Sequence, residues 1–241
     1  MSCVWGQTIG AGDGAYEHPV LPDGCADIVS INGGLELVGP ATNAVTERFA
    51  PGSVVVGVRF RPGAAPPLLR VNAAELRDRE VSLADIWGRT GSTVAERCAD
   101  VPGGAEGPDR LRVLVDALFR RLDDAPPVDP VATRAASMLA AHPAPAVWDL
   151  ARRFDLSERQ LRRRIEATVG YSPRTLARIL RFQRFLGEAR SSGSRGRDLA
   201  RLAAETGYAD QAHLTRDSRR LAGLPPGALL DWEARRTAPA A

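Results

Sequence analysis

The chain has 241 residues, a formal net charge of +3 at pH 7 and 44% hydrophobic residues. This length and apolar content allow one large domain or two ordinary ones, and we favour two. No apolar run reaches the ~18 to 20 residues of a membrane span, and the first ten residues lack the pattern of a signal peptide. We therefore expect a cytoplasmic protein that does not enter a membrane.

The charges are unevenly distributed along the chain. Residues 128–241 carry 20 Arg against 12 Asp and Glu, whereas residues 1–127 carry 12 Arg against 17 Asp and Glu. A basic C-terminal half is the electrostatic footprint of a nucleic-acid partner. The three cysteines are widely spaced without a CxxC pair, which argues against a disulfide framework and against a zinc ribbon.

The first hundred residues predict short strands joined by turns, because Gly and Pro interrupt them repeatedly. Residues 25–31 and 35–38 flank an Asn-Gly-Gly sequence, which favours a hairpin. Short helical turns are expected at residues 73–76 and 83–87. Without helical crossovers, such strands indicate a small antiparallel barrel or sandwich.

The clearest strand is residues 53–60, whose residues alternate between two faces. One face carries Val54, Val56, Val58 and Phe60. Arg59 and Arg61 share the opposite face, and two guanidinium groups pointing into a barrel would favour a carboxylate or phosphate ligand. If that face points outward, which we favour, both are ordinary surface charges.

Residues 99–109 predict a flexible connection, followed by an amphipathic helix over residues 111–122. The apolar face of that helix could pack against a second subunit in a dimer, or it could cover the barrel of its own domain, and the sequence favours the two equally. We place the domain boundaries at residues 1–123 and 131–241, with residues 124–130 as a polar, Pro-containing linker.

From residue 130 onwards the pattern is helical. A first helix is expected at residues 131–141, and a second, shorter one at residues 147–154. Ser157 and Gln160 then form a capping box that opens a further helix. Its outward face carries four arginines, and two short helices joined by a tight turn predict a helix-turn-helix.

A second copy of this pattern follows. A helix of about 18 residues beginning at Ser172-Pro173 would span ~27 Å, and the sequence SSGSRG ends it. Residues 198–206 then form a short helix, and Asp210 caps another over residues 211–222. Since successive major grooves on one side of B-DNA lie ~34 Å apart, the long helix can hold both reading helices in adjacent grooves.

These residues resemble the AraC/XylS family of bacterial transcription regulators, over roughly the last hundred residues. The resemblance is carried by DLARRFDLSERQLRRRIEATVGYSPRTLARILRFQRFL and LARLAAETGYADQAHLTRDSRRLAGLPPGALL. HPVLPDGCADIV, LVGPAT and PGSVVVGVRFRPGAA resemble the cupin-like domain of some actinobacterial regulators. The resemblance implies an α+β protein of two domains: an N-terminal antiparallel β-barrel for sensing or dimerisation, and an all-α domain with two helix-turn-helix units joined by a long helix.

The resemblance also implies roles for residues on the two reading helices. The base-reading positions are Arg159, Arg162, Arg163, Gln211, Ala212, His213, Thr215 and Arg216. Arg can contact guanine and Gln can contact adenine through two hydrogen bonds, each discriminating by ~1 to 3 kcal/mol. The phosphate candidates are Arg164, Arg174, Arg178 and Arg219. For Arg178 and Arg181 we favour the alternative of a solvated helix face.

The chain departs from the family at the second reading helix. Ser218 stands where an aromatic is usually buried, and Leu229 and Leu230 stand where a Phe commonly follows. A buried hydroxyl predicts a gap or an unpaired polar group, and hence a looser second unit. On this argument Ser218→Phe is expected to raise the melting temperature.

In the N-terminal half, His18, Asp23, Cys25 and Asp27 cluster in sequence. With one His in this half, a metal cupin enzyme is not expected. A reactive Cys25 that senses oxidation or alkylation is a minor alternative to a buried structural thiol. Trp5, Tyr16 and Trp87 are candidates for a pocket wall, although core positions are commoner for such residues.

We therefore expect a non-enzymatic, sequence-specific transcription regulator without metal or cofactor, which binds double-stranded DNA in the cytoplasm at the nucleoid. We also expect a homodimer, a possible contact with RNA polymerase and a small-molecule effector of unknown identity for the N-terminal domain. The low-ranked pocket residues are His18, Asp23, Cys25, Arg59 and Arg61. The alternatives are the Cys25 sensor, a ligand-free dimerisation scaffold and an enzyme or alkyl-acceptor built on the β domain.

Overall fold

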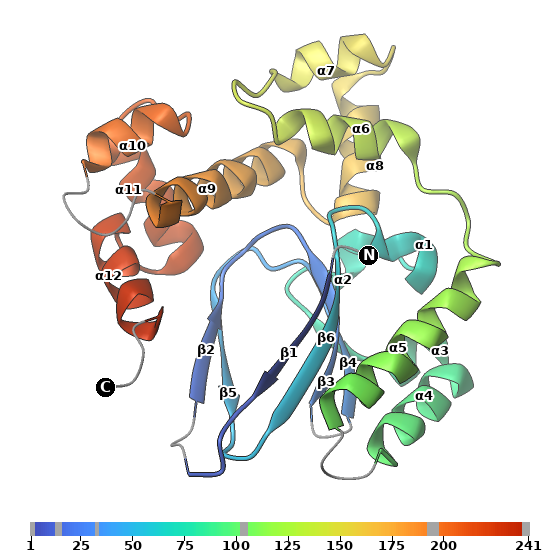
Figure 1. Ribbon diagram of the computed structural model, residues 1–241. Coiled ribbons are helices and arrows are strands. Elements are labelled where there is room, and N and C mark those ends of the chain that lie inside the picture. Colours follow the sequence, from blue (N-terminus) through green and yellow to red (C-terminus); the bar gives the residue numbers. More distant parts are fainter. Residues whose placement is uncertain (1–2, 13–15, 32–33, 102–105, 192–197, 238–241) are drawn as a thin grey trace.

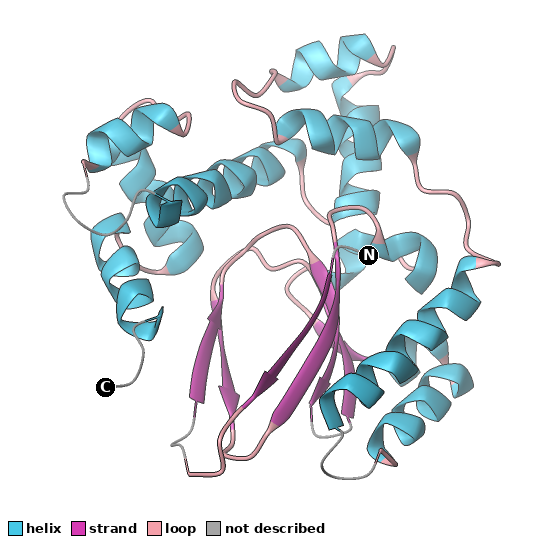
Figure 2. Ribbon diagram, in the orientation of Figure 1, coloured by secondary structure: helices cyan, strands magenta, loops and turns pink. Residues whose placement is uncertain are grey.

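The computed structural model describes residues 3–12, 16–31, 34–101, 106–191 and 198–237. Two antiparallel sheets and a set of helices form the N-terminal half, and seven helices from Pro130 onwards form the C-terminal half of these residues. The predicted α+β class with an N-terminal β domain and a C-terminal helical domain is confirmed (Figures 1 and 2). In the described residues, no helix is both long enough and apolar enough to cross a membrane.

The larger sheet has five strands in the order β1-β6-β3-β4-β7, and β2 pairs with β5 in a second sheet. The strands are β1 (Cys3–Thr8), β2 (Tyr16–Val20), β3 (Ala26–Ile31), β4 (Gly34–Val38), β5 (Val45–Phe49), β6 (Val54–Phe60) and β7 (Glu80–Ser82). Strands β3 and β4 pair antiparallel, as the Asn-Gly-Gly sequence predicted. The first two residues of that turn lie outside the described residues.

Strand β6 separates two hydrophobic cores, because its side chains point alternately to the two faces of the sheet. Val56, Val58 and Phe60 are buried against helices. Val55 points the other way, into a small cluster between the two sheets. The predicted division of this strand into two faces is confirmed, and Arg59 therefore faces the space between the sheets rather than solvent.

The helices between β6 and residue 122 cover the outer face of the larger sheet or its ends (Figure 1). They are α1 (Ala65–Leu69), α2 (Ala73–Leu76), α3 (Leu83–Trp87), α4 (Arg89–Ala99) and α5 (Glu106–Leu122). Two of them, α2 and α3, fall where the sequence placed helical turns. The helices α1 and α4 were not predicted: Pro-Pro at the start of α1 was interpreted as a turn, and α4 has few apolar residues on its buried stripe.

Helix α5 starts five residues earlier than predicted, within the segment expected to be a flexible connection. Its Leu114, Ala117 and Leu118 are buried in the core of the β domain. Of the two interpretations of this helix, the cover for its own sheet is the one observed. The residues between α5 and Pro130 form neither helix nor strand.

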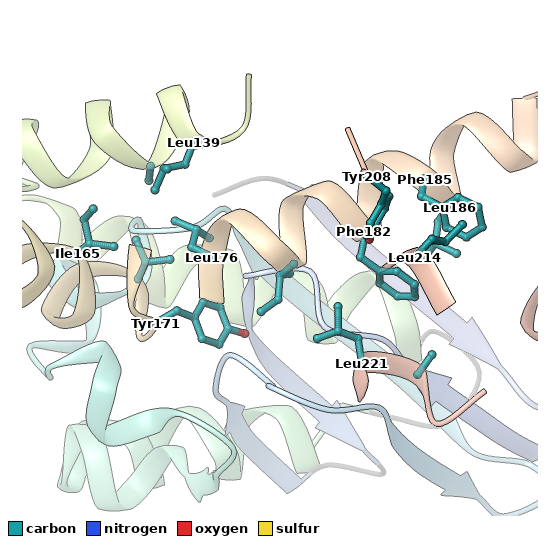
Figure 3. Close-up of a cluster of buried hydrophobic side chains, with 14 of the residues drawn as sticks. Leu139, Ile165, Tyr171, Leu176, Phe182, Phe185, Leu186, Tyr208, Leu214 and Leu221 are labelled. Carbon is teal, nitrogen blue, oxygen red and sulfur yellow. The ribbon is translucent and has the colours of Figure 1, made fainter. Parts of the chain in front are cut away.

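The C-terminal helices share one core. They are α6 (Pro130–Leu139), α7 (Val147–Arg153), α8 (Glu158–Val169), α9 (Pro173–Ser191), α10 (Leu199–Glu205), α11 (Gln211–Ala222) and α12 (Pro226–Thr237). Along α9, Leu176 packs with the first group of helices, and Phe182, Phe185 and Leu186 pack with the second (Figure 3). One continuous core therefore joins the two groups, and α9 lies across one end of the sheets between them (Figure 1). The sequence SSGSRG lies almost wholly outside the described residues.

Candidate functional site

The first helix-turn-helix unit consists of α7 and α8, and its turn is set by local hydrogen bonds. Ser157 Oγ accepts from Gln160 N at 3.2 Å, and Gln160 Oε1 accepts from Ser157 N at 2.9 Å. This is the predicted capping box. Leu161 and Ile165 are fully buried beneath α8, so the remaining face of the helix must point outward.

The four arginines on α8 are exposed, but they differ in their partners. Arg162 pairs with Glu166 one turn later at 2.8 Å, and Arg164 lies 3.4 Å from Asp129 at the start of α6. Arg159 and Arg163 have no ion pair or side-chain hydrogen bond within the part of the chain that the structure describes. Being four residues apart on one face, these two are the guanidinium groups best available to a ligand.

The second unit consists of α10 and α11, and both helices begin at an aspartate. Asp198 Oδ1 accepts from Ala200 N and Arg201 N, and Asp210 Oδ1 accepts from His213 N at 2.6 Å. An N-cap side chain of this kind satisfies donors that the helix itself leaves unpaired. The N-cap at Asp210 was expected from the sequence, whereas that at Asp198 was not singled out.

The five predicted reading positions on α11 fall into two groups. Gln211, Ala212 and Arg216 are exposed. His213 is half-buried, with Nε2 3.2 Å from Arg181 Nη2 and its ring edge against Tyr208 at 5.1 Å between centroids. Thr215 is half-buried and its hydroxyl donates to the Gln211 carbonyl at 2.9 Å. The outward reading face of α11 is therefore narrower than the sequence predicted.

A buried carboxylate ties α11 to α9. Asp217 is 7% exposed, and its two oxygens lie 3.3 Å from Arg178 Nε and 2.9 Å from Arg181 Nη2. The Arg181 guanidinium also stacks over the Tyr208 ring at 4.6 Å. The favoured interpretation of Arg178 and Arg181 as solvated is wrong, and in this conformation Arg178 is committed to Asp217 rather than to phosphate.

The sequence contained a signal for this cluster. Leu214, Asp217, Ser218 and Leu221 recur at three- and four-residue spacing, so Asp217 lies on the apolar seam of its helix. A carboxylate at a seam position is rarely buried without a cation. The periodic arginines of α9 are the cations that it requires.

Ser218 is completely buried, and it is not unpaired. Its Oγ donates to the Leu224 carbonyl at 2.6 Å, so both the hydroxyl and this carbonyl of the loop between α11 and α12 have a hydrogen-bond partner. Leu229 and Leu230 are also buried, in the positions where a Phe was expected. The predicted unpaired hydroxyl is therefore wrong, because the loop has closed onto a small hydrogen-bonding residue.

Of the remaining phosphate candidates, Arg174 and Arg219 are exposed and have no ion pair among the described residues. Arg174 lies in the first turn of α9, and Arg219 lies in the last turn of α11. Arg164 is held by Asp129, which also caps α6 through its bonds to Val131 N and Ala132 N. Arg174 and Arg219 are thus better placed for phosphate than Arg164.

The candidate pocket of the β domain is a cavity of about 400 Å³ between the two sheets. His18, Asp23, Cys25 and Arg59 line it, as proposed from the sequence. Arg61 is exposed and does not. Trp5 also lines the cavity, whereas Trp87 is buried on the opposite side of the sheet.

Arg59 faces this cavity but is already neutralised. Its guanidinium lies 3.0 Å from Asp23 Oδ2 and 3.0 Å from Asp27 Oδ1. Asp27 also accepts from Trp5 Nε1 at 3.0 Å. The interpretation of Arg59 as a surface charge is wrong, and its two carboxylate partners remove the argument for a carboxylate or phosphate ligand.

The thiol of Cys25 is not activated. Burial, followed by the negative charge of Asp23, raises the pKa of Cys25 to about 12. A thiolate is the reactive form of cysteine, so this environment does not favour a redox or alkylation sensor at Cys25. Within the described residues, no three His, Cys, Asp or Glu side chains are grouped so as to hold a metal ion.

Comparisons with known proteins agree with this division of the chain. Residues 150–231 match the profile of a helix-turn-helix domain, and residues 1–82 match a domain of unknown function, DUF6597. Comparison with curated proteins gives no match. The helix-turn-helix profile spans α8 to α11, which include the capped reading helices described above.

Solved structures of ToxT from Vibrio cholerae align over most of the chain at low identity. That of strain O395 has 9% identity and a TM-score of 0.45, covering 95% of this chain and 96% of ToxT. The structure of an apo variant from strain SCE256 has 12% identity and a TM-score of 0.47, and the alignment covers 95% of this chain and 96% of that one. Wild-type ToxT bound to an unsaturated fatty acid has 13% identity and a TM-score of 0.44, and the alignment covers 95% of this chain and 94% of that one.

Proposed function

We propose that this chain, a DNA-binding transcription regulator by virtue of its AraC-type helix-turn-helix domain, reads two adjacent major-groove segments with α8 and α11. The observation that carries the proposal is the pair of capped helices, each with exposed arginine, joined by α9. At 19 residues α9 spans about 28 Å, close to the ~34 Å between successive grooves. This domain type binds DNA and is not catalytic.

The proposed base readers are the exposed residues of the two helices. On α8 they are Arg159, Arg163 and, after release of Glu166, Arg162. On α11 they are Gln211, Ala212 and Arg216, with His213 and Thr215 at the edge of the contact. Arg174 and Arg219 are proposed to contact phosphate. A guanidinium can pair with guanine, an amide with adenine, and the Ala212 methyl with a thymine methyl.

Selection of binding sites from random duplex DNA by the full-length protein tests this proposal. The expected result is a site with two conserved blocks whose centres lie about one helical turn, or roughly 10 base pairs, apart. Binding to that site should weaken steeply as salt is raised, because counterions are released from the phosphates. A single block, or no enrichment at all, would overturn the proposal.

We further propose that the N-terminal domain senses a small molecule in its cavity and passes the signal through one loop. The loop is residues 39–44, between β4 and β5. Gly39 and Ala41 of this loop, and Val45 at the start of β5, line the cavity. A cavity of about 400 Å³ falls in the usual range for small-molecule sites.

The same loop touches both helix-turn-helix units. The Ala41 carbonyl accepts a short hydrogen bond from Tyr171 Oη at 2.5 Å, immediately after α8. Ala44 N donates to the Leu221 carbonyl of α11 at 2.8 Å. A Cβ at Gly170 would lie 2.6 Å from Pro40, so Gly170 also packs closely on the loop. A shift of this loop would therefore act on both reading helices at their C-terminal ends.

Two further hydrogen bonds join the domains. Arg77 Nη1 donates to the Gly170 carbonyl at 3.3 Å, and Gln183 Nε2 on α9 donates to the Pro22 carbonyl at 2.7 Å. Leu21, which precedes Pro22 and lines the cavity, packs against the core of the C-terminal helices. Cavity walls and domain contacts are thus formed by the same two segments.

Removal of one hydroxyl tests this coupling. Tyr171→Phe deletes the hydrogen bond to the loop and is expected to change the operator Kd about fivefold, since such a bond contributes roughly 1 kcal/mol. Thr93→Val is the control, because it removes a hydroxyl whose hydrogen bond, to the Arg89 carbonyl, lies within α4 and away from both helix-turn-helix units. Equal operator affinity in Tyr171→Phe and the wild type would contradict the coupling.

The homodimer, the contact with RNA polymerase and the nucleoid location stay predictions. Sedimentation of the full-length protein with and without its selected operator measures the first of these. A ligand-free dimerisation scaffold is the competing role for the β domain. Thermal-shift screening of the full-length protein separates the two, since a scaffold has no small molecule that stabilises it.

A further inference from the structure

The cavity of the β domain has two chemically different sides, and the strand register defines them. Moving across the larger sheet, Trp5 on β1 faces Gly57, Gly57 faces Val29 on β3, and Val29 faces Glu36 on β4. These positions share the face that lines the cavity. The row therefore runs from an aromatic ring, over an aliphatic side chain, to a carboxylate.

The aromatic side is a flat platform. A Cβ at Gly57 would lie 2.5 Å from two ring carbons of Trp5, so the indole rests directly on the glycine backbone. The hydrogen bond from Trp5 Nε1 to Asp27 holds the ring in that orientation. Phe49, from the opposite sheet, and Val29 complete an apolar surface around it. One face of the indole is thereby left to the cavity.

The other side carries carboxylates without a cation. Glu36, Glu47 and Glu80 come from three strands, β4, β5 and β7, and all three line the cavity. Arg59 is the one arginine among the lining residues that the structure describes, and Asp23 and Asp27 already pair with it. No ion pair to the three glutamates is found in the described residues.

Glu47 lies close to the other two glutamates. Glu47 is half-buried, and its burial, its hydrogen bond with Glu80 and the charge of Glu36 raise its pKa. A positive charge placed among these carboxyl groups would favour the ionised form of Glu47, whereas Glu36 and Glu80 are exposed at the cavity mouth. His18, which also lines the cavity, lies across the strand pair from Glu47.

We propose that the cavity binds an organic cation: an ammonium group on an aromatic or aliphatic body, with the ammonium at Glu36, Glu47 and Glu80 and the body on Trp5. The inference rests on the proposed sensor function and adds the chemical class of the ligand. The cavity is the site, and the carboxylates determine only the sign of the ligand's charge. A metal ion does not suit this site, since the described residues hold no grouping fit for one.

The dimensions limit the ligand further. Gly57, beneath the ring, and Glu36 lie on strands two apart in the sheet, which corresponds to about 10 Å. A compound with a phenyl ring and an ammonium group separated by a short alkyl chain spans this distance. The face of an indole also attracts cations, so a ligand that binds less deeply is still favoured by Trp5.

The position of the carboxylates connects the ligand to the loop that joins the domains. Glu47 is on β5, which follows residues 39–44 directly. Glu80 begins β7, two residues after Asp78, whose carboxylate accepts from Thr42 N and Thr42 Oγ1 in the loop. A cation that draws Glu47 and Glu80 together therefore acts on the loop at two points, at Thr42 and at its C-terminal end.

The test uses three probes with the same phenylbutyl body and different charge. Calorimetry on the full-length protein measures binding of 4-phenylbutylammonium, 4-phenylbutanol and 4-phenylbutyrate. The ammonium compound is expected to bind at least about tenfold tighter than either of the others. Equal or tighter binding of the butyrate, or no binding of the ammonium compound, would overturn the proposal.

Variants locate the site. The double variant Glu47→Gln, Glu80→Gln is expected to bind the ammonium compound about tenfold or more weakly. The control Glu75→Gln, on α2 outside the cavity lining, should bind it with unchanged affinity. Circular dichroism establishes that both variants fold. Ligand-induced quenching of tryptophan fluorescence should be lost in Trp5→Phe, and quenching that persists there would place the ligand elsewhere.

Operator binding is measured separately in the same samples. If the protein selects no duplex DNA but binds the ammonium compound at Glu47 and Glu80, the proposed regulator function fails and the cation site stands. If it selects an operator but binds no ammonium compound, the cation site fails and the DNA-reading function stands.

Discussion

The two helix-turn-helix units have the same design but hold their reading helices in different ways. In the first, Leu161, Ile165 and Val169 of α8 are buried in the helical core, and its arginines are spread over the outer face. In the second, α11 is held to α9 by a buried cluster of Asp217, Arg178 and Arg181. The first unit therefore leaves Arg159 and Arg163 available to a partner, whereas in the second Arg178 and Arg181 of the joining helix are paired internally.

This difference teaches that the arginine content of a helical domain does not measure its DNA-binding surface. Arg174, Arg178 and Arg181 recur on one face of α9, yet two of them stabilise the fold. The sequence suggested that Ser218 would destabilise the second unit. Instead, Ser218 is hydrogen-bonded, and ion pairs of Asp217 with Arg178 and Arg181 hold α11 against α9. We expect the first unit to supply most of the DNA affinity and the second to refine the site.

The largest effect is expected from Asp217→Ala. Removing the carboxylate leaves Arg178 and Arg181 partly buried beside each other, and loss of one partner of such a cluster costs about 3 to 5 kcal/mol. Urea unfolding of the full-length protein measures the loss. Asp149→Ala, which breaks the exposed pair with Arg153, is the control and should cost under about 1 kcal/mol. Similar losses in both variants would contradict the fastening of α11 by charge.

The next effect is expected from Ser218→Phe. Since Ser218 is completely buried and its hydroxyl is hydrogen-bonded, a Phe must displace its neighbours and abolish the bond to Leu224. Such overpacking costs about 1 to 3 kcal/mol. Differential scanning calorimetry should show a lower melting temperature. A higher one would support the interpretation of this position as a gap.

A smaller and more specific effect is expected from single changes of the base readers. Arg163→Ala should relax base preference in one half of the selected site, and Arg216→Ala in the other. Each change should cost about 1 to 3 kcal/mol against the cognate base. Binding to panels of single-base variants measures this. Loss of preference in the same half for both variants would show that the two units do not read separate segments.

The smallest effect is expected from the phosphate candidates. Arg174→Ala and Arg219→Ala should weaken binding to all sequences alike, and each should reduce the salt dependence of log K by about one unit. Fluorescence anisotropy over a range of salt concentrations measures the slope. Arg134→Ala, an exposed arginine on α6, is the control and should leave the slope unchanged. An unchanged slope in the first two variants would remove Arg174 and Arg219 from the interface.

Much of this comparison could be predicted from the sequence, because local chemistry determines it. The capping box at Ser157, the N-cap at Asp210 and the alternation along β6 all depend on neighbouring residues. The same is true of the hairpin between β3 and β4. Patterns of this kind are visible in one segment without knowledge of the rest.

The remainder depends on which distant segments meet. Arg178 and Asp217 are far apart in sequence, so their pairing cannot be inferred from the periodicity of either helix alone. Ser218 could not be assigned a partner because that partner is a backbone carbonyl in the following loop. The glutamates of the cavity were not singled out at all, since Glu36, Glu47 and Glu80 converge only when three strands are assembled.

The central claim is that the two units read separate segments and that the first contributes more to affinity. It is tested most directly by measuring the Kd of the full-length protein for its selected operator with either half randomised, at one fixed salt concentration. The account predicts that randomising the half read by α8 weakens binding more than randomising the half read by α11. Equal losses, or a larger loss from the α11 half, would contradict it.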